Sequence, residues 1–310
     1  MTTAPRFAVL LATYNGAEYL PDQLASLARQ TVDRIDIWVS DDGSADDTLK
    51  IVDDWRARWN KGTVTVVEGP RRGFAENFRS LLCHPEVEAD FVAFCDQDDI
   101  WDDDKLEVAG RALEALPAGE PALYCSRTRL LQDDGTVSGL SPVMPAAPAF
   151  RNALVQSIAG ANTMVLNAPA HRLLRRASHG QPFVSHDWWS YLVVSGAGGH
   201  VHYDPQAHIS YRQHAQNLVG GNASLRAQFK RLTGLLNNRF RNWQDVNIEA
   251  LRQNADLLTA ENAELLARFA EARATGNGLR IAATIRRLRL QRQQRLSQML
   301  LLLTALFGKV

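Results

Sequence analysis

Three carboxylates stand within four positions at the end of an apolar stretch of the chain. The stretch, Phe91–Cys95, contains no polar residue, and Asp96, Asp98 and Asp99 follow it. Negative charges packed at the end of a buried strand are costly unless a positive group lies beside them. Carboxylate oxygens suit Mg2+ and Mn2+, and such an ion can also hold phosphate oxygens. The pattern indicates a divalent-cation site; a surface acidic turn that caps a helix near Lys105 is the alternative.

The elements that must position these carboxylates form an alternating series. Strands are expected at 7–11, 35–40, 63–68 and 91–95. Between them, apolar residues recur at helical spacing, which predicts helices at 18–29, at 45–59 and through Phe78 and Leu82. This order is typical of an α/β fold with a doubly wound, mainly parallel sheet flanked by helices. Ligands bind to such a sheet outside the carboxyl ends of its strands.

Polar clusters follow all four strands. They are Thr13-Tyr14-Asn15, Asp41-Asp42, Arg71 to Gly73, and Asp96 to Asp99. Because parallel strands carry their carboxyl ends to one edge of a sheet, the clusters should converge there. The first strand is not followed by GxGxxG, and neither GxxxxGKS nor GxxxxGKT occurs, which excludes a dinucleotide fingerprint and a P-loop. Acidic clusters in that place favour a nucleoside diphosphate held through a bridging cation.

Four short motifs stand at these strand ends: TYNG at 13–16, SDDGSADDT at 40–48, GFAENF at 73–78 and FCDQDDIW at 94–101. In order and spacing they resemble, over about the first 215 residues, the nucleotide-sugar half of family 2 glycosyltransferases. That family consists of inverting enzymes with the GT-A fold, a Rossmann-like sheet flanked by helices. FCDQDDIW is especially similar to the bacterial rhamnosyltransferase-like branch, which builds surface polysaccharides. The four motifs together are specific, whereas any one of them alone is weak.

The resemblance implies a donor-binding set at the sheet edge. Its members are Thr13, Tyr14, Asn15 and Glu18 in the base and ribose pocket, Asp41 and Asp42 at the pyrimidine or ribose, Gly73 and Asn77 in the wall near the sugar nucleotide, and Asp96 at the ribose or the metal. Two structural alternatives stay open. Asp41 and Gly43 can form a simple turn, and Asn77 can be a residue on the surface of a helix.

The resemblance also implies a metal site and a catalytic base. Asp98 is implied to be the principal ligand of Mg2+ or Mn2+, with Asp96 and His214 beside it. Asp187, in the sequence HDWW, falls at the position of the base that takes the acceptor's hydroxyl proton while that oxygen attacks the anomeric carbon. The two tryptophans after it would offer flat faces to a sugar ring. An ordinary carboxylate at a helix N-terminus is the alternative.

The segment after residue 120 gives weaker signals. A strand at 122–131 precedes a hairpin turn at 133–135, and the proline-containing stretch 141–148 is expected to form a loop on the acceptor side. Gly160 lets a backbone approach closely, and Asn162 is either a donor contact or a buried structural amide. YRQHAQN at 211–217 resembles the family's segment that closes over the diphosphate, which is the reason His214 joins the metal site.

Charge divides the chain into two parts. Residues 1–224 hold 19 Lys and Arg against 28 Asp and Glu, whereas residues 225–310 hold 15 against 6. We therefore expect a glycosyltransferase domain at 1–222 and a helical, basic region at 223–310 with a different partner. The three cysteines lie in apolar surroundings without a CxxC pair, which predicts buried, reduced thiols in a cytoplasmic protein.

The basic region ends in an amphipathic pattern. No acidic residue follows Glu271, arginines alternate with apolar residues from Arg280 to Arg295, and MLLLLTALF comes next. A basic amphipathic helix with a short apolar end is expected to lie in a membrane interface, here at the inner face of the cytoplasmic membrane. No stretch reaches the roughly 18 apolar residues of a spanning helix, and a signal peptide is not expected. Packing against a second subunit is the alternative; nucleic acid is not expected, because the front of the chain is acidic.

These observations predict a metal-dependent, inverting glycosyltransferase. It would move a sugar from a nucleoside diphosphate to a glycan or lipid-linked acceptor in bacterial surface polysaccharide synthesis. Rhamnose from a dTDP donor is the leading expectation by resemblance, and UDP-linked hexoses stay open. Two alternatives are a sugar nucleotidyltransferase, which would need a glycine- and lysine-rich triphosphate loop that LLATYNGAEYL lacks, and a non-catalytic adaptor that binds a sugar nucleotide.

Overall fold

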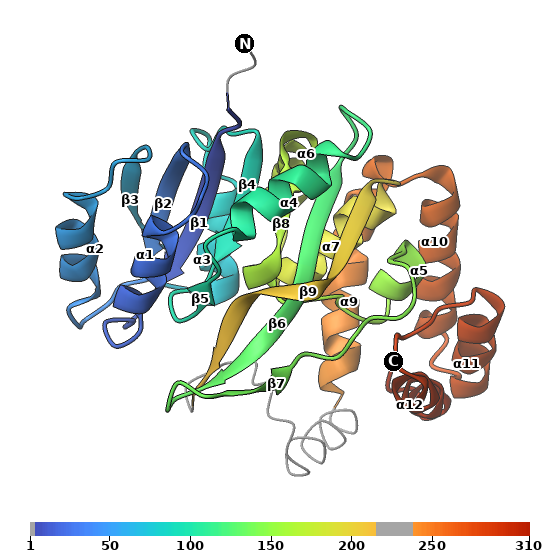
Figure 1. The fold of residues 1–310 in the computed structure, drawn as a ribbon. Coiled ribbons are helices and arrows are strands. Elements are labelled where there is room, and N and C mark those ends of the chain that lie inside the picture. Colours follow the sequence, from blue (N-terminus) through green and yellow to red (C-terminus); the bar gives the residue numbers. More distant parts are fainter. Residues whose placement is uncertain (1–3, 215–237) are drawn as a thin grey trace.

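A single sheet runs through the protein, with helices on both of its faces (Figure 1). The computed structural model describes residues 4–214 and 238–310, and within them nine strands are linked in the order β3-β2-β1-β4-β8-β6-β9-β5, with β7 paired to β6. The strands are β1 (Phe7–Thr13), β2 (Ile35–Asp41), β3 (Val64–Glu68), β4 (Phe91–Cys95), β5 (Ile100–Trp101), β6 (Ala122–Gln132), β7 (Val137–Leu140), β8 (Val165–Asn167) and β9 (His200–Gln213). The helices are α1 (Leu20–Ala28), α2 (Thr48–Arg56), α3 (Phe74–Leu82), α4 (Lys105–Glu114), α5 (Phe150–Ala153), α6 (Ala168–Ser178), α7 (His186–Gly196), α9 (Arg239–Gln253), α10 (Ala260–Ala274), α11 (Gly278–Arg287) and α12 (Arg295–Leu306).

The first four strands make the parallel half of the sheet. β2 and β4 flank β1, and β3 lies outside β2, with all neighbours parallel. The chain order reverses between β1 and β4, so their carboxyl ends form the switch point at which ligands bind. Beyond β4, β8 is antiparallel to β4 and β6, β9 is parallel to β6, and β5 is antiparallel to β9. The predicted α/β fold is confirmed, with a mixed sheet in place of a mainly parallel one.

Apolar side chains of the parallel strands are buried on both faces of the sheet. Phe7, Val9 and Leu11 of β1 join the core formed with α1, α2 and α4, whereas Ala8 and Leu10 join the core formed with α3, α6 and α7. Burial on both sides is the reason these strands read as continuous apolar runs. The three cysteines are free; Cys95 and Cys125 are buried, as predicted, whereas Cys83 is only partly buried. The layered arrangement holds the strand ends, and with them the site, in fixed positions.

The C-terminal helices pack against one of these two cores. Leu251 of α9, Phe269 of α10 and Leu301 of α12 belong to the same apolar cluster as residues of α3, α6 and α7. In Figure 1 these helices gather at the opposite end of the sheet from β3, with α9 behind β9 and α10 beyond α5. The predicted division between residues 222 and 223 falls outside the described residues and stays a prediction.

The basic stretch 280–295 is interrupted, contrary to the expectation of one amphipathic helix. α11 ends before a turn in which Arg289 has a left-handed backbone (φ 54°), and α12 starts several residues later. Arg292 in this linker points inward: its Nε donates to the Val155 carbonyl (2.9 Å) and its guanidinium lies over the Phe240 ring. Among the described residues no helix has the length and apolar character that crossing a bilayer requires.

Candidate active site

The loops after β1, β2 and β4 are tied together at the carboxyl edge of the sheet. The Tyr14 amide donates to Gln97 Oε1 (2.8 Å), and Gln97 Nε2 donates to the Tyr14 carbonyl (3.0 Å). The Asn15 amide donates to Ser44 Oγ (2.8 Å), from a left-handed backbone (φ 46°) that asparagine tolerates. A Cβ on Gly16 would collide with the end of the Gln97 side chain, so a larger residue here would displace Gln97 from its hydrogen bonds to Tyr14. The structure thus brings three of the polar clusters together.

Asp41 and Asp42, at the end of β2, organise the surrounding backbone. Asp41 accepts a hydrogen bond from the Ser44 amide (2.8 Å), which is the turn that the sequence left open as a structural role. Asp42 accepts from the amides of Arg71 (2.6 Å) and Gly73 (2.8 Å). It thereby fixes the loop after β3, in which Gly73 adopts a positive φ of 89° that favours glycine. Both carboxylates are buried and well supplied with donors.

Asn77 of α3 is buried and joins the ends of β1 and β2. Its Nδ2 donates to the Ser40 carbonyl (2.9 Å), and its Oδ1 accepts from Ser40 Oγ (2.5 Å). Thr13, the last residue of β1, donates its hydroxyl proton to Asp41 Oδ2 (2.9 Å). The alternative that Asn77 lies on a helix surface is wrong, because α3 packs over the strand ends and covers the amide.

Two residues of the predicted donor set present their side chains to solvent instead. Tyr14 is 57% exposed, and Glu18 is exposed just before α1. The backbone of Tyr14 is held by Gln97, so its ring stands on a fixed loop. An exposed aromatic ring of this kind offers a face on which a nucleotide base can stack.

Asp96, Asp98 and Asp187 form an acidic group beside this framework. Burial, followed by repulsion from Asp98 and Asp187, raises the pKa of Asp96 to about 7. Such repulsion requires the three carboxylates to lie near one another, although Asp187 comes from a distant segment of the chain. The excess of negative charge suits a divalent cation, and oxygen ligands of this type are the ones that Mg2+ and Mn2+ take.

His214, the last described residue before the gap, contacts Asp98. Its Nε2 lies 2.7 Å from Asp98 Oδ2, and its ring stacks on Tyr19 with 4.7 Å between ring centroids. Arg212 supports the same place, because its Nε donates to the Asp98 carbonyl (3.1 Å) and its guanidinium lies over the Tyr19 ring. The two predicted metal ligands Asp98 and His214 are therefore adjacent. The rest of the YRQHAQN segment, from residue 215 onward, lies outside the described residues.

Asp187 occupies the first turn of α7, where burial raises its pKa. Ser157 Oγ donates a hydrogen bond to its Oδ2 (3.2 Å). The expectation that the next two tryptophans face a sugar is wrong. Trp188 and Trp189 are buried, and their indole N–H groups donate to a backbone carbonyl and to Ser178 Oγ. The reason is that α7 is enclosed by the sheet and its neighbouring helices, so its aromatic residues serve the core.

Asp99, the third carboxylate of the motif, has a structural place. It is fully buried, burial raises its pKa, and it accepts hydrogen bonds from Asn162 Nδ2 (2.6 Å) and from the Arg212 amide (3.2 Å). Asn162, for which the sequence left two roles open, is thus the buried amide. Gly160 fits closely beside it, since a Cβ there would lie 2.7 Å from Asn162 Oδ1.

Sequence reasoning missed three residues that shape the site. Gln97 stands inside FCDQDDIW, so the motif itself was a signal for it. Ser157 carries no recognisable signal. His186 lies against the Phe78 ring (3.8 Å between centroids), and neither ring nitrogen has a hydrogen-bond partner among the described residues. Burial lowers the pKa of His186 to about 3, so a neutral imidazole stands directly before Asp187.

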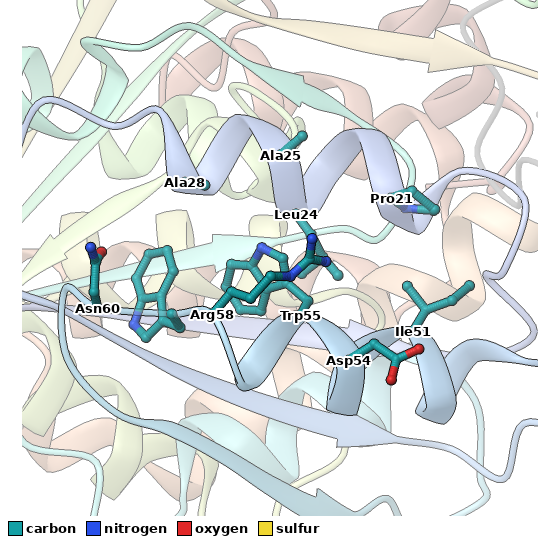
Figure 2. Close-up of a pocket in the computed structure, with 10 residues that line it drawn as sticks. Pro21, Leu24, Ala25, Ala28, Ile51, Asp54, Trp55, Arg58 and Asn60 are labelled. Carbon is teal, nitrogen blue, oxygen red and sulfur yellow. The ribbon is translucent and has the colours of Figure 1, made fainter.

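A pocket of about 490 Å3 opens between α1 and α2 (Figure 2). Leu24 of α1 and Trp55 of α2 form much of its apolar wall, and Arg58 and Asn60 stand at its edge. None of the predicted donor, metal or base residues lines it. Its lining offers few polar groups for a nucleotide sugar, so the chemistry belongs to the strand ends rather than to this pocket.

A second acidic group lies between β5 and β9. Asp102, Asp104 and His208 hold possible ligand atoms within 4.8 Å of one another. Arg129 forms an ion pair with Asp102, and His208 lies within 3.4 Å of Asp104. A positive guanidinium thus already offsets this group.

Comparison with known proteins decides the family. Residues 8–158 match the model of "Glycosyl transferase family 2". Residues 8–158 are a family 2 glycosyltransferase domain. The match covers the loops after β1 to β4, including Asp96 and Asp98, whereas Asp187 and His214 lie beyond it. The predicted family and the predicted class of enzyme, a glycosyltransferase, are confirmed.

Individual relatives agree with this family. The chain is 27% identical to the dTDP-rhamnosyl transferase RfbG of Shigella flexneri over an aligned stretch of 237 residues. That stretch makes up 74% of this chain and 80% of the Shigella protein. A structure of Staphylococcus aureus TarS 1-349 with UDP-GlcNAc superposes with a TM-score of 0.59 at 18% identity, over 98% of this chain and 89% of that one. A mannosyltransferase from Pyrobaculum calidifontis with GDP-Man and Mn2+ superposes with a TM-score of 0.53 at 20% identity, over 98% and 86%. The two structural likenesses support the fold, which is the predicted GT-A fold.

Proposed function

We propose that this family 2 glycosyltransferase inverts the anomeric carbon of a nucleoside-diphosphate sugar in one displacement. The acceptor hydroxyl oxygen forms a bond to the anomeric carbon, the bond from that carbon to the diphosphate oxygen breaks, and Asp187 takes the hydroxyl proton. The observation that carries the proposal is the gathering of Asp187 with Asp96 and Asp98 beside the tethered strand-end loops. Ser157 orients the base through its hydrogen bond to Oδ2.

The donor lies, in this proposal, along the loops after β1, β2 and β3. Tyr14 and Glu18, whose side chains are exposed, contact the base and ribose, and Asn15 shapes that pocket. Asp41, Asp42, Thr13 and Asn77 act chiefly by holding the loops in place, and Gly73 leaves room for the sugar nucleotide. A dTDP-linked rhamnose is the donor we favour, because the Shigella relative is named as a dTDP-rhamnosyl transferase.

A divalent cation fits the acidic group. The charges of Asp98 and Asp187 repel that of Asp96, and Asp98 and His214 offer an oxygen and a nitrogen in contact. We propose that Asp98, with Asp96 and His214, holds Mg2+ or Mn2+. When bound, such an ion would offset the charge of the departing diphosphate. The fixed loops around the group keep its carboxylates in place before any ligand arrives.

The acceptor we propose is a glycan or a lipid-linked sugar of a bacterial surface polysaccharide. We further place the enzyme at the inner face of the cytoplasmic membrane, where such acceptors are presented. Association into a homo-oligomer remains a prediction of the sequence.

A donor panel tests the proposal. The purified protein is incubated with dTDP-rhamnose, UDP-hexoses and GDP-mannose in Mn2+, with release of nucleoside diphosphate and transfer to lipid extracts as readouts. We expect one donor to yield product that depends on added acceptor. Release of pyrophosphate from a nucleoside triphosphate would favour a nucleotidyltransferase instead. Donor binding without turnover under all conditions would favour a non-catalytic adaptor.

A further inference from the structure

The outward face of α12 is apolar. Leu296, Met299, Leu303, Leu306 and Phe307 are 68%, 68%, 50%, 46% and 69% exposed. Their spacing of three, four, three and one residues places them on one side of the helix. A helix of a soluble domain normally turns such a stripe to the core and its polar residues to water. An exposed apolar stripe of this size marks a surface that binds something.

The inward side of the same helix carries Leu301 and Ala305, which are buried in the core, together with polar side chains. Gln298 Nε2 donates to the Leu290 carbonyl (3.1 Å), and Gln298 Oε1 accepts from the Arg292 amide (2.7 Å). Thr304 is buried and donates its hydroxyl proton to the Leu300 carbonyl (2.8 Å). The helix is thus held by Leu301 and Ala305 in the core and by the hydrogen bonds of Gln298 to the preceding linker, and its exposed apolar side chains take no part in this packing.

Exposed arginines are concentrated in the chain that leads into α12, from the end of α11 to the first residue of α12. Arg286, Arg287, Arg289 and Arg295 are exposed, and none of them forms an ion pair within residues 4–214 and 238–310. No acidic residue occurs in the sequence beyond Glu271. An apolar stripe on a helix that exposed arginines precede in the chain complements the anionic headgroups and acyl boundary of a bilayer. The same charges argue against a second copy of the chain, because a symmetric pair would bring these arginines together.

The face is joined rigidly to the catalytic side. The linker before α12 is bound to the loop that precedes Ser157: the Gln293 amide donates to Gln156 Oε1 (2.9 Å), and Asn152 Nδ2 donates to the Gln291 carbonyl (2.8 Å). Ser157 in turn contacts Asp187. In Figure 1, α12 lies toward the lower edge of the molecule, the edge at which β1 ends. A surface held by α12 would therefore lie at a fixed position relative to the proposed base.

We propose that α12 and the arginines that precede it form a docking face for an anionic membrane surface. The apolar stripe enters the interface, the arginines contact the headgroups, and no segment spans the bilayer. This proposal rests on the proposed function for one point: the docking face would bring the site to a lipid-linked acceptor. Binding to a membrane can be measured without any sugar transfer.

Vesicle co-sedimentation of the full chain tests the docking face. We expect at least about tenfold more protein on vesicles of phosphatidylglycerol and phosphatidylethanolamine than on phosphatidylcholine alone, with loss of the difference at high salt. The triple variant Met299→Gln, Leu303→Gln, Phe307→Gln should lose about tenfold or more of the binding. The matched control changes three other exposed apolar residues, Leu49→Gln, Val137→Gln and Leu140→Gln, and should bind as the parent does.

Two results would overturn the proposal. One is a parent protein that stays in the supernatant with anionic vesicles, or that binds neutral vesicles equally well. The other is a dimer in light scattering that the triple variant converts to a monomer, which would assign the face to a second copy. Donor binding by calorimetry separates the two proposals: intact donor affinity without vesicle binding removes only the docking face, whereas no donor binding by the parent removes the proposed function.

Discussion

Two acidic groups stand at the same edge of the sheet and have opposite surroundings. Asp41 and Asp42, after β2, accept hydrogen bonds from backbone amides of their own and the neighbouring loop. Asp96, after β4, lies near two further carboxylates, Asp98 and Asp187, whose charges repel it. The fold itself completes the first group. The second is left with excess negative charge, which is typical of a site that a ligand completes.

The difference has an energetic side. Amides that lose a buried carboxylate partner are left unpaired, so the first group stabilises the folded chain. Mutual repulsion makes the second group costly until a cation arrives. We therefore expect substitutions in the two groups to act in opposite directions on stability.

Replacement of Asp187 by asparagine should give the largest effect. The amide keeps the shape of the side chain but cannot take the acceptor proton, so kcat should fall by about 10²–10⁴. Donor affinity should change little. Release of nucleoside diphosphate in the presence of acceptor measures kcat, and calorimetry with the donor measures donor affinity. Asp134→Asn, in the exposed hairpin turn, is the control; an Asp187→Asn variant that retains a tenth of the activity would remove this aspartate from its role.

Replacement of Asp42 by alanine should destabilise the protein. The amides of Arg71 and Gly73 lose their acceptor, which costs about 1–3 kcal/mol in the free energy of unfolding. Urea denaturation followed by circular dichroism measures the loss, with Asp133→Ala at an exposed position as the control. An Asp42→Ala variant as stable as its control would show that the first group is not completed by the fold.

Replacement of Asp96 by asparagine should raise stability, and only above mildly acidic pH. The folded protein keeps this proton up to a pKa of about 7, whereas the unfolded chain releases it near pH 4. Folding thus takes up a proton between these values, and the stability of the parent falls as the pH rises through them. In metal-free buffer the melting temperature of the variant should exceed that of the parent by a few degrees at pH 7.5. An equally large difference in melting temperature between variant and parent at pH 4 would contradict this account.

The parallel half of the fold follows from the sequence because its cause is local. Strands covered on both faces leave continuous apolar runs, and the polar residues after them mark the binding edge. β9 is harder, since His200–Gln213 is half-exposed, contains Pro205 and changes register against β6. Its residue pattern, in which polar and apolar residues do not alternate regularly, does not mark a strand of this length.

The candidate site divides in the same way. Motif residues such as Asp98 and Asn15 are visible in the sequence, because their spacing after a strand places them at the edge. Which carboxylate is buried and which is exposed depends on contacts between distant segments, as for Asp99 with Asn162. The burial of Trp188 and the exposed apolar face of α12 likewise depend on what packs beside each helix, which periodicity alone does not reveal.

The most direct test of the account is the metal dependence of nucleotide binding. Calorimetry compares binding of dTDP and UDP to the parent and to Asp98→Ala, each with Mn2+ and with EDTA. We expect Mn2+ to tighten binding to the parent by about tenfold or more, which corresponds to about 1.4 kcal/mol or more, and to leave the variant unchanged. Equal affinity of the parent in Mn2+ and in EDTA would contradict the claim that the acidic group is completed by a cation and a diphosphate.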